Sequence, residues 1–302
     1  MHATPLMDRI LRRVSLYTPN LFATNAALLG LHFLVKNRRF PRTPAKNGAA
    51  LSDYLFWKSI GRWDEFERAC VDKESAKQVA RQLCPEIGVP DVIDVFSLAD
   101  MSYPAFRERI LAHRGRAAVA KPTHGCGAIL FLEDEFGEAE LQKFYRDCRA
   151  SYFQLFREGQ YYQLQKKVII ERALGDRAKG RKSADDYKFF CSRGRAFLCQ
   201  VNLDRFGDHR LINVTVPDFT DSGVEYGTVR PDVMPEPPAR WGDMVRFAAA
   251  LSRPFEFVRI DLYEGADDIY FGEFTFTPGA GLTHFSDPGF DRWLLGQLQM
   301  SP

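Results

Sequence analysis

Residues 256–278, with the sequence EFVRIDLYEGADDIYFGEFTFTP, predict a β-hairpin, which must belong to a larger sheet. Apolar and polar side chains alternate on both sides of a turn at 264–268, the pattern of two half-buried strands. Successive strand side chains point to opposite faces, so Arg259 and Asp261 share one face and the intervening apolar residues share the other. The chain is therefore predicted to contain a sheet with one apolar face and one charged face.

Glu273 lies in the middle of the second strand, where a buried carboxylate is costly unless it is paired. If Asp261 lies opposite Phe271, then Glu273 is diagonal to Asp261 at about 7 Å between Cβ atoms, and Thr275 continues the row of Phe271 and Glu273. Oxygen ligands of this kind suit Mg²⁺, and the planar guanidinium of Arg259 suits a phosphate or a carboxylate. A charged hairpin face in contact with solvent is the alternative.

The rest of the chain mixes helical and strand patterns, which predicts an α+β fold. Helices are predicted over 1–35, 51–88, 138–158 and 241–255, strands over 91–98 and 165–174, a strand–turn–strand unit over 117–132, and a hairpin over 186–207. Ser52 or Asp53 is expected to cap the helices of 51–88, and Gly88 to end them. Residues 37–48 are expected to form a basic linker.

Two shorter motifs suit a nucleotide. The loop KPTHGCG (121–127) contains Gly125 and Gly127, which let backbone N–H groups approach phosphates, while Lys121 adds positive charge. It lacks the ending of a Walker A loop, and an ordinary hairpin turn is the alternative. Glu171 ends an apolar strand, where it suits a hydrogen bond to an adenine edge or is simply an exposed strand end.

The basic stretch DRAKGRKSADDYK (176–188) is either a solvated loop or a segment that closes over phosphates. Its glycines and serine make 175–186 the predicted lid. A nucleic-acid binder that uses 177–195 is a further alternative. We do not expect a nucleic-acid partner, because the aromatic residues there fit a strand core better than a stacking platform and the net charge is only +2.

Six motifs in this order resemble the ATP-grasp superfamily, as in D-alanine–D-alanine ligases. They are DKESAK (72–77), KPTHGCG (121–127), IERAL (170–174), DYK (186–188), RID (259–261) and GEFT (272–275). Over about residues 37–296 the chain looks most similar to the TupA-like (teichuronopeptide biosynthesis) branch. The resemblance implies two α+β subdomains that clasp ATP, with a hinge near 171–174. It divides the chain into a helical N-terminal region (1–70) and an ATP-grasp domain (71–302).

The resemblance also implies a role for each matched position. The residues implied to bind the nucleotide are Lys73, Lys121, Gly125, Gly127, Glu171, Ala173, Leu174, Asp186, Lys188 and Arg205. Among them, Lys73, Lys121 and Arg205 would contact phosphates, and Lys188 would contact the nucleotide. Glu171 and the backbone of 172–174 would hold adenine, and Asp186 would hold the ribose. Asp261, Glu273 and Thr275 would hold Mg²⁺, and Arg259 and Lys121 would be catalytic. Thr275 stands where typical ligases have Asn, so a water would complete its contact to the metal.

The activity implied is an ATP- and Mg²⁺-dependent carboxylate–amine ligase that forms an amide through an acyl-phosphate. The branch suggests a role in cell-surface polysaccharide or glycan biosynthesis, with a glycan or sugar acid among the substrates. A phosphotransferase on the same fold and a nucleotide-binding scaffold without catalysis are the alternatives. No motif identifies the carboxylate and amine, and the superfamily's ligases suggest a homodimer.

The N-terminal 46 residues are strongly basic, with a local net charge of +7. The apolar run 21–35 is too short to cross a bilayer, which takes about 20 residues, so a buried helix is expected. Docking of residues 1–46 on an anionic membrane or a glycan-assembly partner is the alternative to packing on the rest of the chain. The six cysteines lack metal or disulfide spacing and suggest free thiols in the cytoplasm, with the inner face of the membrane as the place of action if 1–46 dock there.

Overall fold

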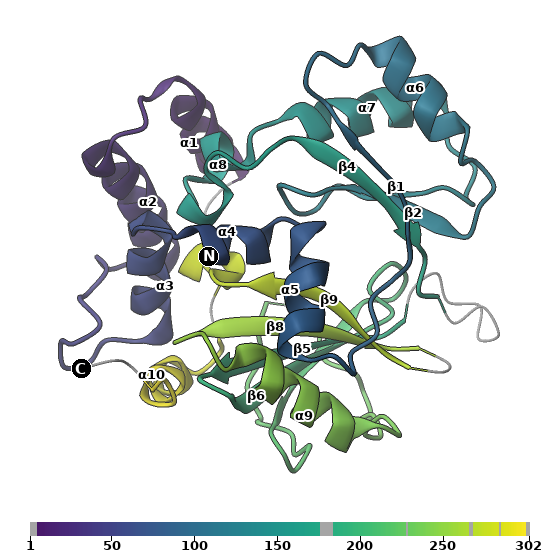
Figure 1. Ribbon diagram of the computed structural model, residues 1–302. Coiled ribbons are helices and arrows are strands. Elements are labelled where there is room, and N and C mark those ends of the chain that lie inside the picture. The colour runs from purple at the N-terminus through teal and green to yellow at the C-terminus, as the bar shows by residue number, and fades with distance from the viewer. Residues whose placement is uncertain (1–4, 176–183, 228, 266–267, 284, 300–302) are drawn as a thin grey trace.

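The computed structural model describes residues 5–175, 184–227, 229–265, 268–283 and 285–299 (Figure 1). Its strands form two antiparallel sheets, of four and five strands. The smaller sheet has the order β1-β4-β2-β3, with β1 Val92–Ser97, β2 Ala118–Pro122, β3 Leu130–Phe131 and β4 Lys167–Arg172. The larger has the order β7-β6-β5-β8-β9, with β5 Asp186–Ser192, β6 Arg195–Leu203, β7 Arg210–Thr215, β8 Val258–Glu264 and β9 Ile269–Thr275. The predicted α+β class is confirmed.

Two helices, α6 (Tyr103–Leu111) and α7 (Glu138–Arg149), cover one face of the smaller sheet (Figure 1). Phe106 and Ile110 of α6 are fully buried in a core that also contains Phe144 of α7. Alternate residues of the strands, including Ala120 and Ile170, point into the same core. The other face of this sheet is thereby left free to line a site.

The larger sheet is covered by α9 (Trp241–Ser252), and α5 (Ser75–Leu83) packs on both α9 and β9. Ile260 and Leu262 of β8 lie in this core at 0% exposure, as the predicted alternation of the hairpin requires. The helix predicted over 241–255 and the hairpin predicted over 186–207 are therefore confirmed, with small differences at their ends.

The N-terminal residues are helical, as predicted, and they pack on the rest of the chain. The helices are α1 (Pro5–Tyr17), α2 (Phe22–Asn37), α3 (Leu51–Ile60) and α4 (Glu65–Val71). Leu29 and Phe33 of α2 are fully buried against Phe56 of α3. Helix α1 contacts the short helix α8 (Tyr152–Phe156). No described helix combines the length and the hydropathy needed to span a bilayer.

Three predicted helix boundaries are wrong. Helix α3 is capped at Ala50, whose backbone N–H donates to Asp53 Oδ2 at 2.9 Å, so Asp53 lies in the first turn. Gly88 does not end a helix, because α5 stops at Leu83 and Gly88 instead forms a bridge to Tyr270 of β9. The helix predicted over 138–158 breaks at Ser151, which caps α8 by accepting from Gln154 N at 3.2 Å.

The predicted register of the β8–β9 hairpin is also wrong. Asp261 lies directly opposite Glu273, while the neighbouring pair is Leu262 and Phe271, so Gly272 is the extra residue of a bulge. The bulge turns Phe271 into the apolar core instead of leaving it in the row of Glu273. A Cβ at Gly272 would lie 2.6 Å from the ring of Tyr263, so this close approach requires glycine.

Candidate functional site

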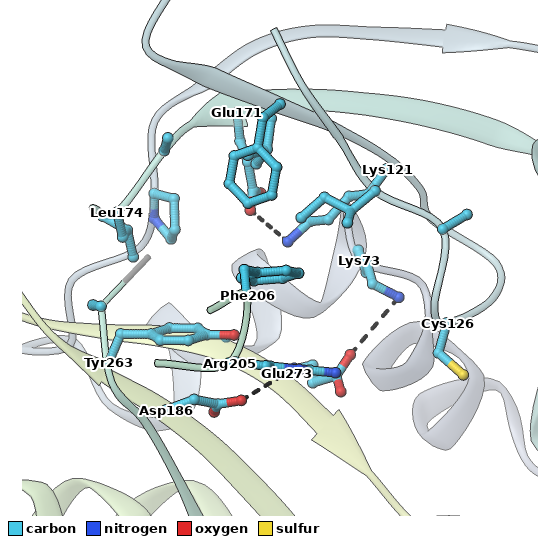
Figure 2. A pocket seen from close by; sticks show the side chains of 18 of the residues that line it. Lys73, Lys121, Cys126, Glu171, Leu174, Asp186, Arg205, Phe206, Tyr263 and Glu273 are labelled. Atoms are coloured by element: carbon cyan, nitrogen blue, oxygen red, sulfur yellow. Dashed lines mark hydrogen bonds and ion pairs between the residues drawn. The ribbon is translucent and has the colours of Figure 1, made fainter. Parts of the chain in front are cut away.

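A single pocket, here called the inter-sheet pocket, is lined by residues from both sheets (Figure 2). Nine of the ten positions predicted to contact the nucleotide line it: Lys73, Lys121, Gly125, Gly127, Glu171, Ala173, Leu174, Asp186 and Arg205. The tenth, Lys188, does not line it but pairs with Asp186, which does. Of the predicted metal ligands, Glu273 lines the pocket, whereas Asp261 and Thr275 do not. The fold therefore brings together residues that are far apart in the sequence.

On the side of the smaller sheet, Glu171 of β4 pairs with two lysines. Its Oε1 lies 2.5 Å from Lys121 Nζ and its Oε2 lies 2.8 Å from Lys77 Nζ. Burial alone would raise the pKa of Glu171, but the two lysines outweigh burial and lower it to about 2. Glu171 is therefore a buried, ionised carboxylate, and an adenine edge would compete with Lys121 for it.

On the side of the larger sheet, Asp261 is held by two cations. Arg259 donates to both of its oxygens, at 2.6 and 2.7 Å, and Lys188 Nζ lies 2.5 Å from Oδ2. Arg259 Nη2 also reaches Thr275 Oγ1 at 3.1 Å and Glu273 at 3.4 Å. Arg259, a predicted catalytic residue, thus contacts all three predicted metal ligands, Asp261, Glu273 and Thr275.

Glu273 is the most open member of this row, with 30% of its side chain exposed. Burial would raise its pKa, but Lys73 and Arg259 outweigh that effect and hold the pKa below the usual range for Glu. Lys73 Nζ lies 3.7 Å from Glu273 and donates to the carbonyl of Gly125 at 2.5 Å. Figure 2 shows Lys73 between Glu273 and the loop that carries Cys126, so this lysine joins the acidic row to the glycine loop.

Asp186, at the start of β5, is 1% exposed and faces two cations. Its Oδ2 lies 2.5 Å from Lys188 Nζ and 3.1 Å from Arg205 Nη1. Its Oδ1 is buried without a hydrogen-bond partner among the described residues. Such an atom costs free energy unless a ligand donates to it, so Asp186 suits a hydroxyl group.

The donor set fits Mg²⁺ in its chemistry. Asp261 and Glu273 are directly opposed on neighbouring strands and offer carboxylate oxygens, which this cation prefers. Both oxygens of Asp261 are occupied by Arg259, so a bound cation would displace part of that contact. Within the described ranges no cluster of three or more His, Cys, Asp or Glu residues is placed to hold a metal, so a bound cation would need further ligands from phosphates or water.

Several residues at the site had no predicted role. Lys77 does not line the pocket but pairs with Glu171, which does. Lys77 closes the DKESAK motif, and its position there was a usable signal. Tyr263 continues the two-residue spacing of Arg259 and Asp261 along β8. The alternation of side chains along a strand therefore predicts that it points to the same face as they do. Phe131 and Phe206 meet edge to face at 5.0 Å between ring centroids and bridge the two halves of the pocket. No sequence pattern indicated that contact. The predicted lid, 175–186, lies mostly outside the described residues.

The sequence matches one family model, described as TupA-like ATPgrasp, over residues 60–299. No curated protein matches it. Among solved structures, it is similar to D-alanine–D-alanine ligase from Bacillus anthracis complexed with ATP (15% identity, 70% of this chain and 55% of that chain, TM-score 0.38). It is also similar to D-alanine–D-alanine ligase from Helicobacter pylori (14%, 78% and 60%, 0.41). A third is the ATP-grasp ligase PsnB with its minimal precursor, Mg and ADP (15%, 75% and 58%, 0.36). The chain thus spans 55% to 60% of the length of these structures.

Proposed function

The chain belongs to the TupA-like ATP-grasp family, and on that basis we propose that it is an ATP-dependent ligase that joins a carboxylate to an amine. The observation that carries the proposal is the convergence of Lys73, Lys121, Asp186, Arg205 and Glu273 in one pocket lined from both sheets. Cations and carboxylates arranged around an open space suit a nucleoside triphosphate with its metal.

ATP would lie along this pocket with its base toward the smaller sheet. The apolar side chains of Leu174, Phe131 and Phe206 line that region and offer surfaces for a purine ring. The unpartnered Oδ1 of Asp186 would accept a hydrogen bond from a ribose hydroxyl. Lys73, beside the glycine loop, would then face the phosphates.

The proposed reaction has two steps. An oxygen of the substrate carboxylate attacks the γ-phosphorus of ATP, ADP leaves, and an acyl-phosphate forms. The amine nitrogen then attacks the acyl carbon, phosphate leaves, the nitrogen loses a proton, and an amide remains. Arg259 and Lys121 would stabilise the negative charge that develops on the transferred group. Mg²⁺, held by Asp261 and Glu273 with Thr275 nearby, would supply further neutralisation of phosphate charge when bound.

Two features beyond the chemistry complete the proposal. Residues 175–186 would act as a lid that excludes water from the acyl-phosphate. The helical N-terminal region would comprise residues 1–70 and the ATP-grasp domain residues 71–302. Residues 171–174 would form the hinge between the two subdomains that clasp ATP. These assignments rest on the family resemblance and on the position of Ala173 and Leu174 at the pocket.

The biological setting we propose is the assembly of a cell-surface polysaccharide on the cytoplasmic side of the membrane. Helices α1 and α2 leave apolar side chains exposed, including Tyr17 at 86% and Phe22 at 65%, beside the exposed Arg13. Apolar and basic groups together favour an anionic membrane surface or a glycan-assembly partner. All six cysteines are free, which agrees with a reducing compartment. A homodimer is part of the same proposal.

The first experiment is calorimetry of ATP binding with and without Mg²⁺. We expect Mg²⁺-dependent binding in the wild type and its loss in Asp261→Asn/Glu273→Gln. The matched control is Asp232→Asn/Glu65→Gln, which removes the same charges from exposed positions that line no described pocket. Absence of ATP binding to the wild type would contradict the proposal.

A second experiment separates ligation from the alternative phosphotransferase. Purified protein is incubated with ATP, Mg²⁺ and panels of carboxylates and amines, and products are identified by mass spectrometry. ADP release that needs both partners and yields an amide supports the ligase. A stable phosphorylated hydroxyl compound without amide would assign the chain to the phosphotransferases instead.

A further inference from the structure

Glu171 faces one lysine more than its charge requires. Its two oxygens lie 2.5 Å from Lys121 Nζ and 2.8 Å from Lys77 Nζ. One cation is enough to neutralise a buried carboxylate, so the three side chains together carry a net positive charge. The proposed ATP site gives Lys121 a task at the phosphates but assigns none to Lys77.

The two lysines reach Glu171 from different parts of the fold. Lys121 lies on β2, which pairs with β4, and both Lys121 and Glu171 point to the face of the smaller sheet opposite its apolar core. Lys77 projects from α5, which packs on α9 and on β9 of the larger sheet. The contact between Lys77 and Glu171 therefore joins this helix to the end of β4, at the predicted hinge 171–174.

The two lysines also differ in their access to the inter-sheet pocket. The Lys121 side chain is 20% exposed and lines the pocket, whereas the Lys77 side chain is 5% exposed and does not line it. Figure 2 shows Lys121 at the pocket wall with its ion pair to Glu171. Lys77 is thus held at Glu171, while Lys121 is placed to exchange Glu171 for a phosphate.

Such an exchange would be unfavourable if Lys121 were the only cation at Glu171. A buried carboxylate that loses its counter-ion costs more free energy than one charge-assisted hydrogen bond to a phosphate gains. With Lys77 in place, Glu171 stays paired when Lys121 departs. The Oε1 atom that Lys121 leaves can then accept a hydrogen bond from the exocyclic amino group of adenine.

We propose that Lys77 is a positioning residue that keeps Glu171 paired while Lys121 moves from that carboxylate to the phosphates of the nucleotide. The inference rests on the proposed function for the identity of the ligand, ATP. Lys77 itself does not touch ATP. Its presence releases Lys121 for the phosphates and opens Glu171 to the base, so phosphate affinity and base preference both depend on one buried lysine.

Calorimetry with nucleotides that lack one group at a time tests this inference. The gain from the phosphates is the ratio of ATP affinity to adenosine affinity, with adenosine measured by competition against ATP. Lys121→Met should lower this ratio about tenfold, the scale of a hydrogen bond to a charged group. Lys77→Met should lower it by a similar factor, because Lys121 then stays on Glu171. The preference for ATP over ITP, in which an oxo group replaces the amino group, should fall as well.

A second substitution separates this role from support of the fold. In Lys77→Met/Glu171→Gln no carboxylate remains to retain Lys121, so the ratio of ATP to adenosine affinity should return to within threefold of the wild type. The preference for ATP over ITP should stay low, because the charged acceptor is gone. A lysine that merely stabilised the fold would not have its loss repaired at Glu171. The matched control is Lys143→Met, which removes an exposed lysine paired with Asp147 at 2.6 Å and should bind as the wild type does.

The outcomes decide the inference separately from the proposed function. An unchanged ratio of ATP to adenosine affinity in Lys77→Met would overturn the inference while the wild type still binds ATP. A ratio that stays tenfold low in Lys77→Met/Glu171→Gln would also overturn it. If circular dichroism shows that Lys77→Met does not fold, this double variant decides alone, since it replaces both charges of the buried pair. No ATP binding by the wild type would contradict the proposed function itself, and the inference with it.

Discussion

The two pockets differ in how they handle charge. In the inter-sheet pocket each buried carboxylate faces at least one cation, as Glu171 faces Lys77 and Lys121. A second pocket, here called the aromatic pocket, is lined by the turn between α1 and α2, by α8 and by the 3₁₀ helix η1 (Gly159–Tyr161). There the buried Arg157 has only neutral partners, and all five of its N–H groups donate to them. In the inter-sheet pocket positive and negative side chains are thus paired with one another, and a nucleotide with its cation can replace some of these ion pairs. In the aromatic pocket, neutral hydrogen bonds use every donor of the cation, so Arg157 links α8 to the N-terminal helices.

The largest predicted effect comes from removal of the Glu273 carboxylate, which is the partly exposed one in the inter-sheet pocket. Glu273→Gln should lower turnover by about 100- to 1,000-fold, because an electrostatic contact in a site has that scale. Steady-state ADP release provides the measurement. Wild-type turnover would remove Glu273 from the metal assignment.

Glu158, a buried residue that follows Arg157 in the chain, gives a prediction for pH. Its Oε2 accepts from Thr277 Oγ1 at 2.6 Å, just beyond β9. Burial raises the pKa of Glu158 from 4.5 to about 7, against the opposing hydrogen bonds of Thr277 and Gln160. The folded protein thus keeps a proton that the unfolded chain has already lost between these two pH values.

The direction in which stability changes with pH follows from this difference in bound protons between the folded and unfolded states. The contribution of Glu158 to stability is fully present below pH 4.5 and is lost as the pH rises through about 7. Glu158→Gln removes this loss of stability. The free energy of unfolding of the variant minus that of the wild type should therefore be about 3 kcal/mol larger at pH 8 than at pH 4.5. Urea denaturation across this range measures it, with the exposed Glu65→Gln as control. A constant difference between Glu158→Gln and the wild type would contradict the prediction.

The bulge at Gly272 offers a smaller effect that is confined to the inter-sheet pocket. In Gly272→Ala the new Cβ would lie 2.6 Å from Tyr263 Cε2 and 3.0 Å from Asp261 O, so the strand or the ring must shift. We expect a loss of about 2 kcal/mol in the free energy of unfolding, typical of overpacking, and weaker ATP binding because Tyr263 lines the pocket. Denaturation and ATP calorimetry measure the two effects.

Gly242→Ala is the matched control for the bulge. Gly242 lies in α9, and a Cβ at this position would meet no atom within 4 Å outside the helix's own nearby backbone. Alanine there should therefore stabilise the helix by about 0.5–1 kcal/mol. If the two variants had the same free energy of unfolding and the same ATP affinity, the bulge would tolerate a side chain. That result would weaken the assignment of Glu273 opposite Asp261.

The sequence predicted the inter-sheet pocket better than any other part of the molecule. Lys121, Glu171 and Asp186 lie at or near the ends of predicted strands, and the fold brings these strand ends together. The error in the hairpin register has a physical cause. Whether Gly272 pairs or bulges depends on the ring of Tyr263 on the neighbouring strand, and a single strand pattern carries no such information.

The aromatic pocket was not predicted, because its wall is assembled from segments without a shared period. The turn at 18–20 meets α8 and η1 only in the folded chain, and Arg157 reaches across to Ser15. One local signal was available and unused. Ser151 and Gln154 have the spacing of a helix start, which would have divided 138–158 into the two helices that exist.

The smallest predicted effect concerns the contact that joins the pockets. Tyr152→Phe removes the hydroxyl that accepts the Cys126 thiol hydrogen, while the ring remains beside Tyr161. A thiol–hydroxyl hydrogen bond is weak, so the free energy of unfolding should fall by only about 0.5–1 kcal/mol. Urea denaturation of the wild type and of Tyr152→Phe measures the difference. An unchanged free energy of unfolding would show that this contact does not stabilise the loop 121–127.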